Sequence, residues 1–85
     1  MSLAGWYEPL REATADVFDG WIKSATERFA AAGIPDQTAR ELAIGLIGAL
    51  EGALLLSRAA RSTEPMDVAG AIAVASVEAA PARVC

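Results

Sequence analysis

The stretch ELAIGLIGALEGALLLSRAAR, residues 41–61, is the feature that most restricts how this chain can fold. Between Glu41 and Ser57 only Glu51 is charged, and three residues are glycines. Placed on a helical wheel at about 100° per residue, the stretch has two apolar sides. A surface helix of a monomer needs only one apolar side. This helix therefore needs two different packing partners.

Three stripes run along this helix. The broad apolar face carries Leu42, Leu46, Ile47, Leu50 and Leu54. The other apolar side carries Gly45, Gly48, Gly52 and Ala59, flanked by Leu55 and Leu56. Between them lies a thin polar line of Arg40, Glu51 and Arg58. Glu51 is either solvated or loosely paired on this line, or it is partly buried against an arginine or a ligand.

Three arrangements could hold such a helix: a membrane span, a helix buried wholly in its own chain, or a helix shared with a second copy. Residues 42–56 fall short of the roughly 20 apolar residues that cross a bilayer, where Glu51 would cost about 2–3 kcal/mol. The remainder of an 85-residue chain is too small to cover two apolar sides. Eight Leu and Ile side chains are each worth about 1.5–3 kcal/mol when buried. We therefore predict a homodimer.

A helix on either side of this segment completes the predicted unit. The first runs from about Pro9, which suits a first helical turn, to Ala32. Gly33 then provides a left-handed end, Ile34 can pack back on the last turn, and Pro35 prevents continuation. Apolar residues spaced three and four apart give this helix one apolar face.

The central helix is expected from about Asp36 to Arg61, and the third from about Pro65 to Ala79. Asp36 is either the N-cap or an acidic first-turn residue behind Pro35 at N1. The predicted fold class is all-α: a three-helix unit whose second and third helices form an intermolecular four-helix bundle in the homodimer. Residues 1–8 are expected to be an N-terminal leader that cloning could have added, 9–79 the helical domain, and 80–85 a frayed tail.

Composition excludes several functions. The net charge of −4 argues against a nucleic-acid surface in these residues. The chain has no His, no nucleophile–base pair and no cluster of metal ligands, so we expect neither an enzyme nor a cofactor or metal site. The single cysteine, Cys85, cannot form an internal disulfide, and the N-terminus does not have the pattern of a signal peptide. A cytoplasmic protein is predicted.

The residues from Phe18 to Pro65 resemble the C-terminal domain of TetR-family transcriptional regulators, especially the LmrA/YxaF-like subgroup. The matching features are an aromatic pair like Phe18 and Trp21, a Gly-Ile-Pro break, a Leu-Glu-Gly-Ala-Leu core at 50–54, and a Glu-Pro pair at 64–65. The resemblance implies that the last two helices dimerise, as the wheel indicates independently. It also implies that the first two helices border a pocket for a small, mostly apolar effector.

Two sets of residues follow as candidates. The predicted dimer interface is Gly45, Gly48, Gly52, Leu55, Leu56, Val68, Ile72 and Ala75. The predicted ligand-binding residues, for each of which core packing is the more frequent role, are Phe18, Trp21, Ile22, Ile47 and Leu50. Trp21 is the strongest of these because a buried indole N–H requires a partner.

The family's helix-turn-helix domain has no counterpart in these residues. DNA would therefore be bound only through a domain absent from the chain, and a fragment or a truncated product is expected. The first alternative is a stand-alone helical structural or interaction module, and the remote one is a membrane-associated helical hairpin.

Overall fold

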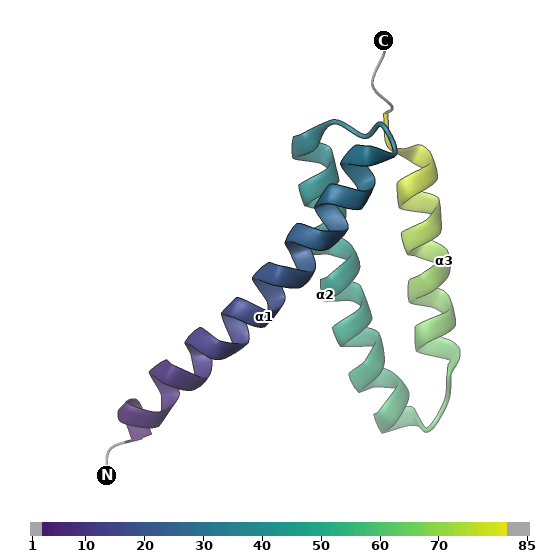
Figure 1. Cartoon of the computed structure of the whole chain (residues 1–85). Coiled ribbons are helices and arrows are strands. Elements are labelled where there is room, and N and C mark those ends of the chain that lie inside the picture. The colour runs from purple at the N-terminus through teal and green to yellow at the C-terminus, as the bar shows by residue number, and fades with distance from the viewer. Residues whose placement is uncertain (1–2, 82–85) are drawn as a thin grey trace.

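The computed structural model describes residues 3–81, which form three helices: α1 (Leu3–Ala31), α2 (Asp36–Ala60) and α3 (Glu64–Ala79). Figure 1 shows α3 running back alongside α2, while α1 crosses α2 and its N-terminal half points away from the other two helices. Residues 3–81 contain no strand. The all-α, three-helix prediction is confirmed, whereas the intermolecular bundle stays a prediction.

The predicted start of the first helix is wrong. α1 begins at Leu3, and Pro9 lies inside it. The only backbone bond that Pro9 removes belongs to the first turns of the helix, where few bonds depend on it. An exposed salt bridge from Arg11 to Glu8, with 3.1 Å between Nη2 and Oε2, also spans the proline on the helix surface. The boundary predicted at residue 8 therefore falls within a helix.

The break between α1 and α2 agrees with the sequence prediction. Gly33 has a φ of +102°. Its N–H donates to the carbonyl of Ala30 at 3.0 Å, and that of Ile34 donates to the carbonyl of Phe29 at 3.1 Å. This pair of bonds is the Schellman pattern, in which the residue after the glycine packs back on the helix. Ile34 is accordingly buried, with 6% of its surface exposed.

The start of α2 resolves the alternative that the sequence left open. Pro35 occupies the N-cap position with an extended backbone, and its carbonyl accepts a bond from the N–H of Ala39 at 2.8 Å. Asp36 is the first residue of the helix, where a carboxylate complements the helix dipole. Asp36 is therefore an acidic first-turn residue, as one of the two alternatives predicted, but Pro35 is the N-cap and not the N1 residue.

The end of α2 repeats the Schellman pattern without a glycine. Arg61 has a φ of +50°, and the N–H of Ser62 donates to the carbonyl of Ser57 at 3.1 Å. Residues with a Cβ lose roughly 1–2 kcal/mol in this left-handed conformation, and glycine does not.

We therefore expect the Arg61→Gly substitution to raise the free energy of unfolding by about 1 kcal/mol. Urea denaturation at a fixed protein concentration measures the change. Arg61→Ala is the matched control, because it removes the same side chain but keeps the Cβ. A glycine variant no more stable than the alanine variant would show that the backbone conformation at residue 61 is not strained.

The three helices make a thin and extended body. The Cα atoms span 57 × 31 × 12 Å and have a radius of gyration of 16.0 Å, against about 12 Å expected for a compact domain of this length. Only α2 packs against both other helices in the described part of the chain. The smallest of these dimensions, 12 Å, is little more than the 8–10 Å that separates the axes of two packed helices, so the body is at most two helices thick. The α2–α3 pair is therefore bare on the side away from α1.

The core consists of small side chains. The buried apolar residues are Ile34, Ala39, Ala43 and Ala53, and no large side chain within the described residues is fully buried. Alanine at these positions lets α2 approach its neighbours closely. Leu42 and Leu46 are only half-buried, and Leu50 and Leu54 are 37% and 39% exposed. One chain thus covers only part of the broad leucine face, because α1 diverges from α2 (Figure 1).

Candidate interface and ligand-binding surfaces

The glycine side of α2 points away from the core of its own chain. Gly48 follows the buried Ala39 by nine residues, and Gly52 follows the buried Ala43 by the same interval. Nine residues correspond to a rotation of about 180° around the helix. In agreement, no atom lies within 4 Å of a Cβ placed on Gly45, Gly48 or Gly52. No described side chain reaches the Cβ positions of these three glycines, although Gly45 also lies at the edge of the space between α2 and α3.

All eight residues of the predicted interface are exposed: Gly45, Gly48, Gly52, Leu55, Leu56, Val68, Ile72 and Ala75. The large ones are well exposed, at 69% for Leu55, 62% for Leu56 and 61% for Ile72. Val68, Ile72 and Ala75 lie four and three residues apart and so form one stripe on α3. No residue of α3 is buried. Their pairing with a second copy stays a prediction.

The accessible surface of the chain is large for its mass. It measures 6386 Å², whereas a folded monomer of 8.8 kDa is expected to expose about 4,800 Å². A standard protein–protein interface buries about 800 Å² on each partner, and obligate homodimers bury more. The excess is therefore large enough to supply one side of a stable dimer.

The predicted ligand-binding residues come from α1 (Phe18, Trp21 and Ile22) and α2 (Ile47 and Leu50). Phe18 and Trp21 meet edge to face, with 5.3 Å between ring centroids and 87° between ring planes, an arrangement that aromatic quadrupoles favour. Trp21 is half-exposed, whereas Phe18, Ile22 and Ile47 are half-buried. The described residues thus leave the Trp21 ring partly uncovered. The role of these residues in ligand binding stays a prediction.

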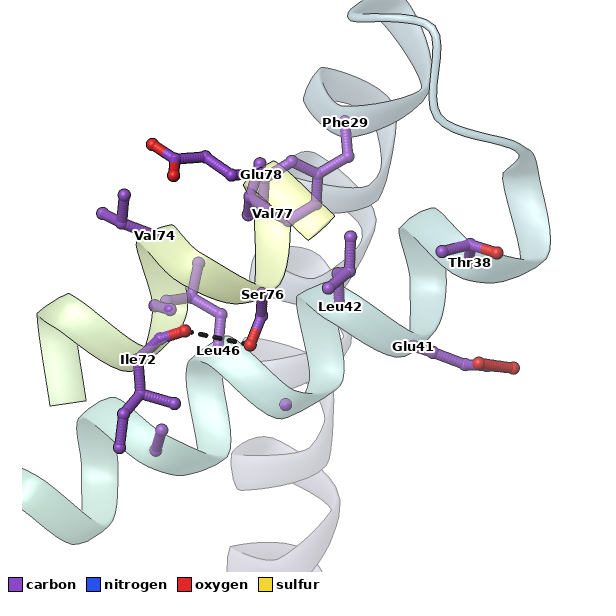
Figure 2. Close-up of a pocket in the computed structure, with 13 residues that line it drawn as sticks. Phe29, Thr38, Glu41, Leu42, Leu46, Ile72, Val74, Ser76, Val77 and Glu78 are labelled. Carbon is purple, nitrogen blue, oxygen red and sulfur yellow. Dashed lines mark hydrogen bonds between the residues drawn. The ribbon is translucent and has the colours of Figure 1, made fainter. Parts of the chain in front are cut away.

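A groove of about 720 Å³ between α2 and α3 was not predicted from the sequence. Figure 2 shows that the first half of α2 and the second half of α3 form its walls, and that Phe29 reaches it from α1. Its large apolar residues are Phe29, Leu42, Leu46, Ile72, Val74 and Val77. None of the five predicted ligand-binding residues lines the groove, but Gly45 and Ile72 of the predicted interface do.

The polar line on α2 faces solvent in the single chain. Arg40, Glu51 and Arg58 are all exposed. Glu51 makes no ion pair or hydrogen bond with any described residue. In one protomer Glu51 is therefore a solvated carboxylate, as the first of its two interpretations requires.

The sequence argument against a membrane span took the apolar segment to be residues 42–56 only. The helix α2, Asp36–Ala60, is long and apolar enough to cross a membrane by length and composition, and an 18-residue window within it has a mean hydropathy of 1.6 with 11% of that window buried. The predicted limit of residues 42–56 is corrected because the helix continues on both sides of this segment. Core helices of soluble proteins also satisfy these criteria, and Glu51 near the middle of the helix opposes insertion.

Comparison with known proteins places the chain in a family. Residues 2–72 match the model of the transcriptional regulator LmrA/YxaF-like C-terminal domain. Two similar proteins are the uncharacterized HTH-type transcriptional regulators MT0206 and Rv0196 of Mycobacterium tuberculosis, strains CDC 1551 / Oshkosh and ATCC 25618 / H37Rv. Each is 43% identical over 60 residues, which cover 71% of this chain and 31% of the relative's length. No solved structure matches significantly. The chain thus belongs to the LmrA/YxaF-like C-terminal domains of TetR-type transcriptional regulators.

Proposed function

We propose that this domain joins two copies of a transcriptional regulator through α2 and α3 and supplies part of a small-molecule effector site on α1 and α2. The observation that carries the proposal is the glycine side of α2, which is apolar and lies opposite the buried alanines. The stripe of Val68, Ile72 and Ala75 on α3 is exposed as well in the described chain. A second copy offers the same surface, as a two-fold axis requires.

Small residues support close packing of the two copies. Gly45, Gly48 and Gly52 add no side chain between the helix axes, so α2 of one copy could approach the partner's helices closely. Leu55 and Leu56 flank the glycines and would lose most of their exposure. Burying them provides the apolar area that drives association. Two α2–α3 pairs would then form a four-helix bundle.

The effector part of the proposal rests on the aromatic pair of α1. Trp21 presents an apolar ring and one N–H donor, and half of its surface is exposed. Such a residue can both pack on an apolar molecule and fix its orientation. In the longer regulator, an effector that binds one arrangement of α1 and α2 more tightly would shift the spacing of the DNA-reading domains. The regulator would act in the cytoplasm.

Light scattering on the purified chain tests the dimer directly. At micromolar concentration we expect a mass of about twice the 8.8 kDa of one chain, because the α2–α3 surface drives association in water. The mass should not change on dilution to low micromolar concentration. A homogeneous species with the mass of one chain would contradict the proposal, and material that dissolves only in detergent would favour the membrane interpretation.

A further inference from the structure

Two opposite charges in the second half of α2 have no partner in the described part of their own chain. Glu51 and Arg58 are both exposed, and neither makes an ion pair within residues 3–81. They are seven residues apart, which is about 10 Å along the helix, so they are not neighbours on its surface. The line that they share runs about a quarter of a turn from the glycine side. Both charges therefore lie at the edge of the surface proposed for the second copy.

The register of the two α2 helices decides which residues meet, and this inference rests on the dimer proposed above. In an antiparallel pair related by a two-fold axis, the same edge of both helices comes together, so the polar line of one copy faces that of the other. An axis between residues 53 and 54 brings Gly48 opposite the partner's Ala59, and Gly52 opposite the partner's Leu55. In this register the apolar side chains fill the space that the glycines leave.

The charges favour this register over one centred on the glycines. Two positions, or about 3 Å along the helix, separate Glu51 from the level of the partner's Arg58, and both side chains are long enough to span this. If Gly45 instead faced the partner's Gly52, Arg40 would lie within one position of the partner's Arg58. Like charges brought together in this way oppose association.

We propose that the carboxylate of Glu51 pairs with the guanidinium of the partner's Arg58, twice in each dimer, and that this pair selects both the register and the partner. The pair flanks the apolar contact, where charges contribute more to specificity than to affinity. A related domain with a positive charge at position 51 or a negative charge at position 58 would place like charges together. The pair would therefore favour a second copy of this chain over such a domain.

Charge reversals in the whole chain test the pair by sedimentation equilibrium. Glu51→Lys and Arg58→Glu should each raise the dimer Kd about tenfold at low salt, because both symmetric contacts then join like charges. An equimolar mixture of the two variants should associate as the original chain does, and so should the double variant, since every contact again joins opposite charges. At about 1 M salt the differences should largely disappear, because exposed charges are then screened within about 3 Å.

Arg40→Glu is the matched control, because it makes the same change of charge on the same exposed line. In the proposed register residue 40 lies beyond the end of the partner's α2, so this variant should leave the Kd nearly unchanged and should not rescue Glu51→Lys. Rescue by Arg40→Glu, or an unchanged Kd in Glu51→Lys and Arg58→Glu, would overturn the pair while leaving the dimer in place. A monomeric original chain would contradict the dimer itself, so the two failures are distinguishable.

Discussion

Replacing Gly48 by leucine should separate the dimer into single chains while leaving the fold of each chain intact. No atom lies within 4 Å of a Cβ at Gly48, so one chain has room for the new side chain. The helix itself gains roughly 1 kcal/mol, because glycine is a poor helix former. Across a two-fold interface, however, two leucines would enter a tight contact, and overpacking costs about 1–3 kcal/mol at each. The dimer dissociation constant should rise about 100-fold or more.

Sedimentation equilibrium and circular dichroism measure the two halves of this expectation. The mass should fall from that of a dimer to that of one chain, and the helical signal should stay the same or increase. Gly20→Leu is the matched control, because Gly20 is also a helical glycine with no atom within 4 Å of its Cβ position. It lies on α1, outside the proposed interface. If the Gly48 variant remains a dimer, α2 does not use its glycine side for association.

Replacing Ala43 by leucine should destabilise the chain itself. Ala43 is fully buried, with no exposed surface, on the side of α2 opposite Gly52. A leucine there would force the helices apart at the position where only small side chains fit. Overpacking of this kind costs about 1–3 kcal/mol, and more where the backbone cannot move. For a small domain this is a large part of a total of about 5–15 kcal/mol.

Thermal unfolding followed by circular dichroism at a fixed concentration measures the loss, and a fall in Tm of more than about 8 °C is expected for a domain of this size. The matched control is Ala49→Leu, which makes the same change on the same helix. Ala49 is exposed and lines the groove, where the added side chain has space. Equal stability of the two variants would mean that Ala43 is not closely packed against the neighbouring helices.

Local sequence signals account for the elements that were predicted correctly. The break at Gly33 and Ile34 depends on backbone bonds within six residues, so the local sequence is sufficient to predict it. The start of α1 was missed because Pro9 was interpreted as a first-turn residue. A proline is also tolerated in the second turn, because the one backbone bond that it removes lies near the start of the helix, and the exposed Arg11–Glu8 salt bridge spans it.

The candidate surfaces were likewise predicted only in part from the sequence. The wheel placed Gly48 and Gly52 on a side of their own, and the structure places that side opposite the buried alanines. The helical wheel could not show that the leucine face is only half covered, because this depends on the angle at which α1 leaves α2 (Figure 1). The groove was missed for a similar reason. Leu42 and Val77 are 35 positions apart, and only the antiparallel return of α3 sets them beside one another.

The sequence by itself therefore determined that the chain is helical, where two of its breaks lie, and that its central helix has two apolar sides. These properties follow from the period of the helix and from the backbone preferences of glycine and proline, which act over a few residues. Only the tertiary structure decided which side of α2 the chain covers and which it leaves bare. That choice depends on crossing angles and on the distance between helix axes, which side chains far apart in the sequence set together.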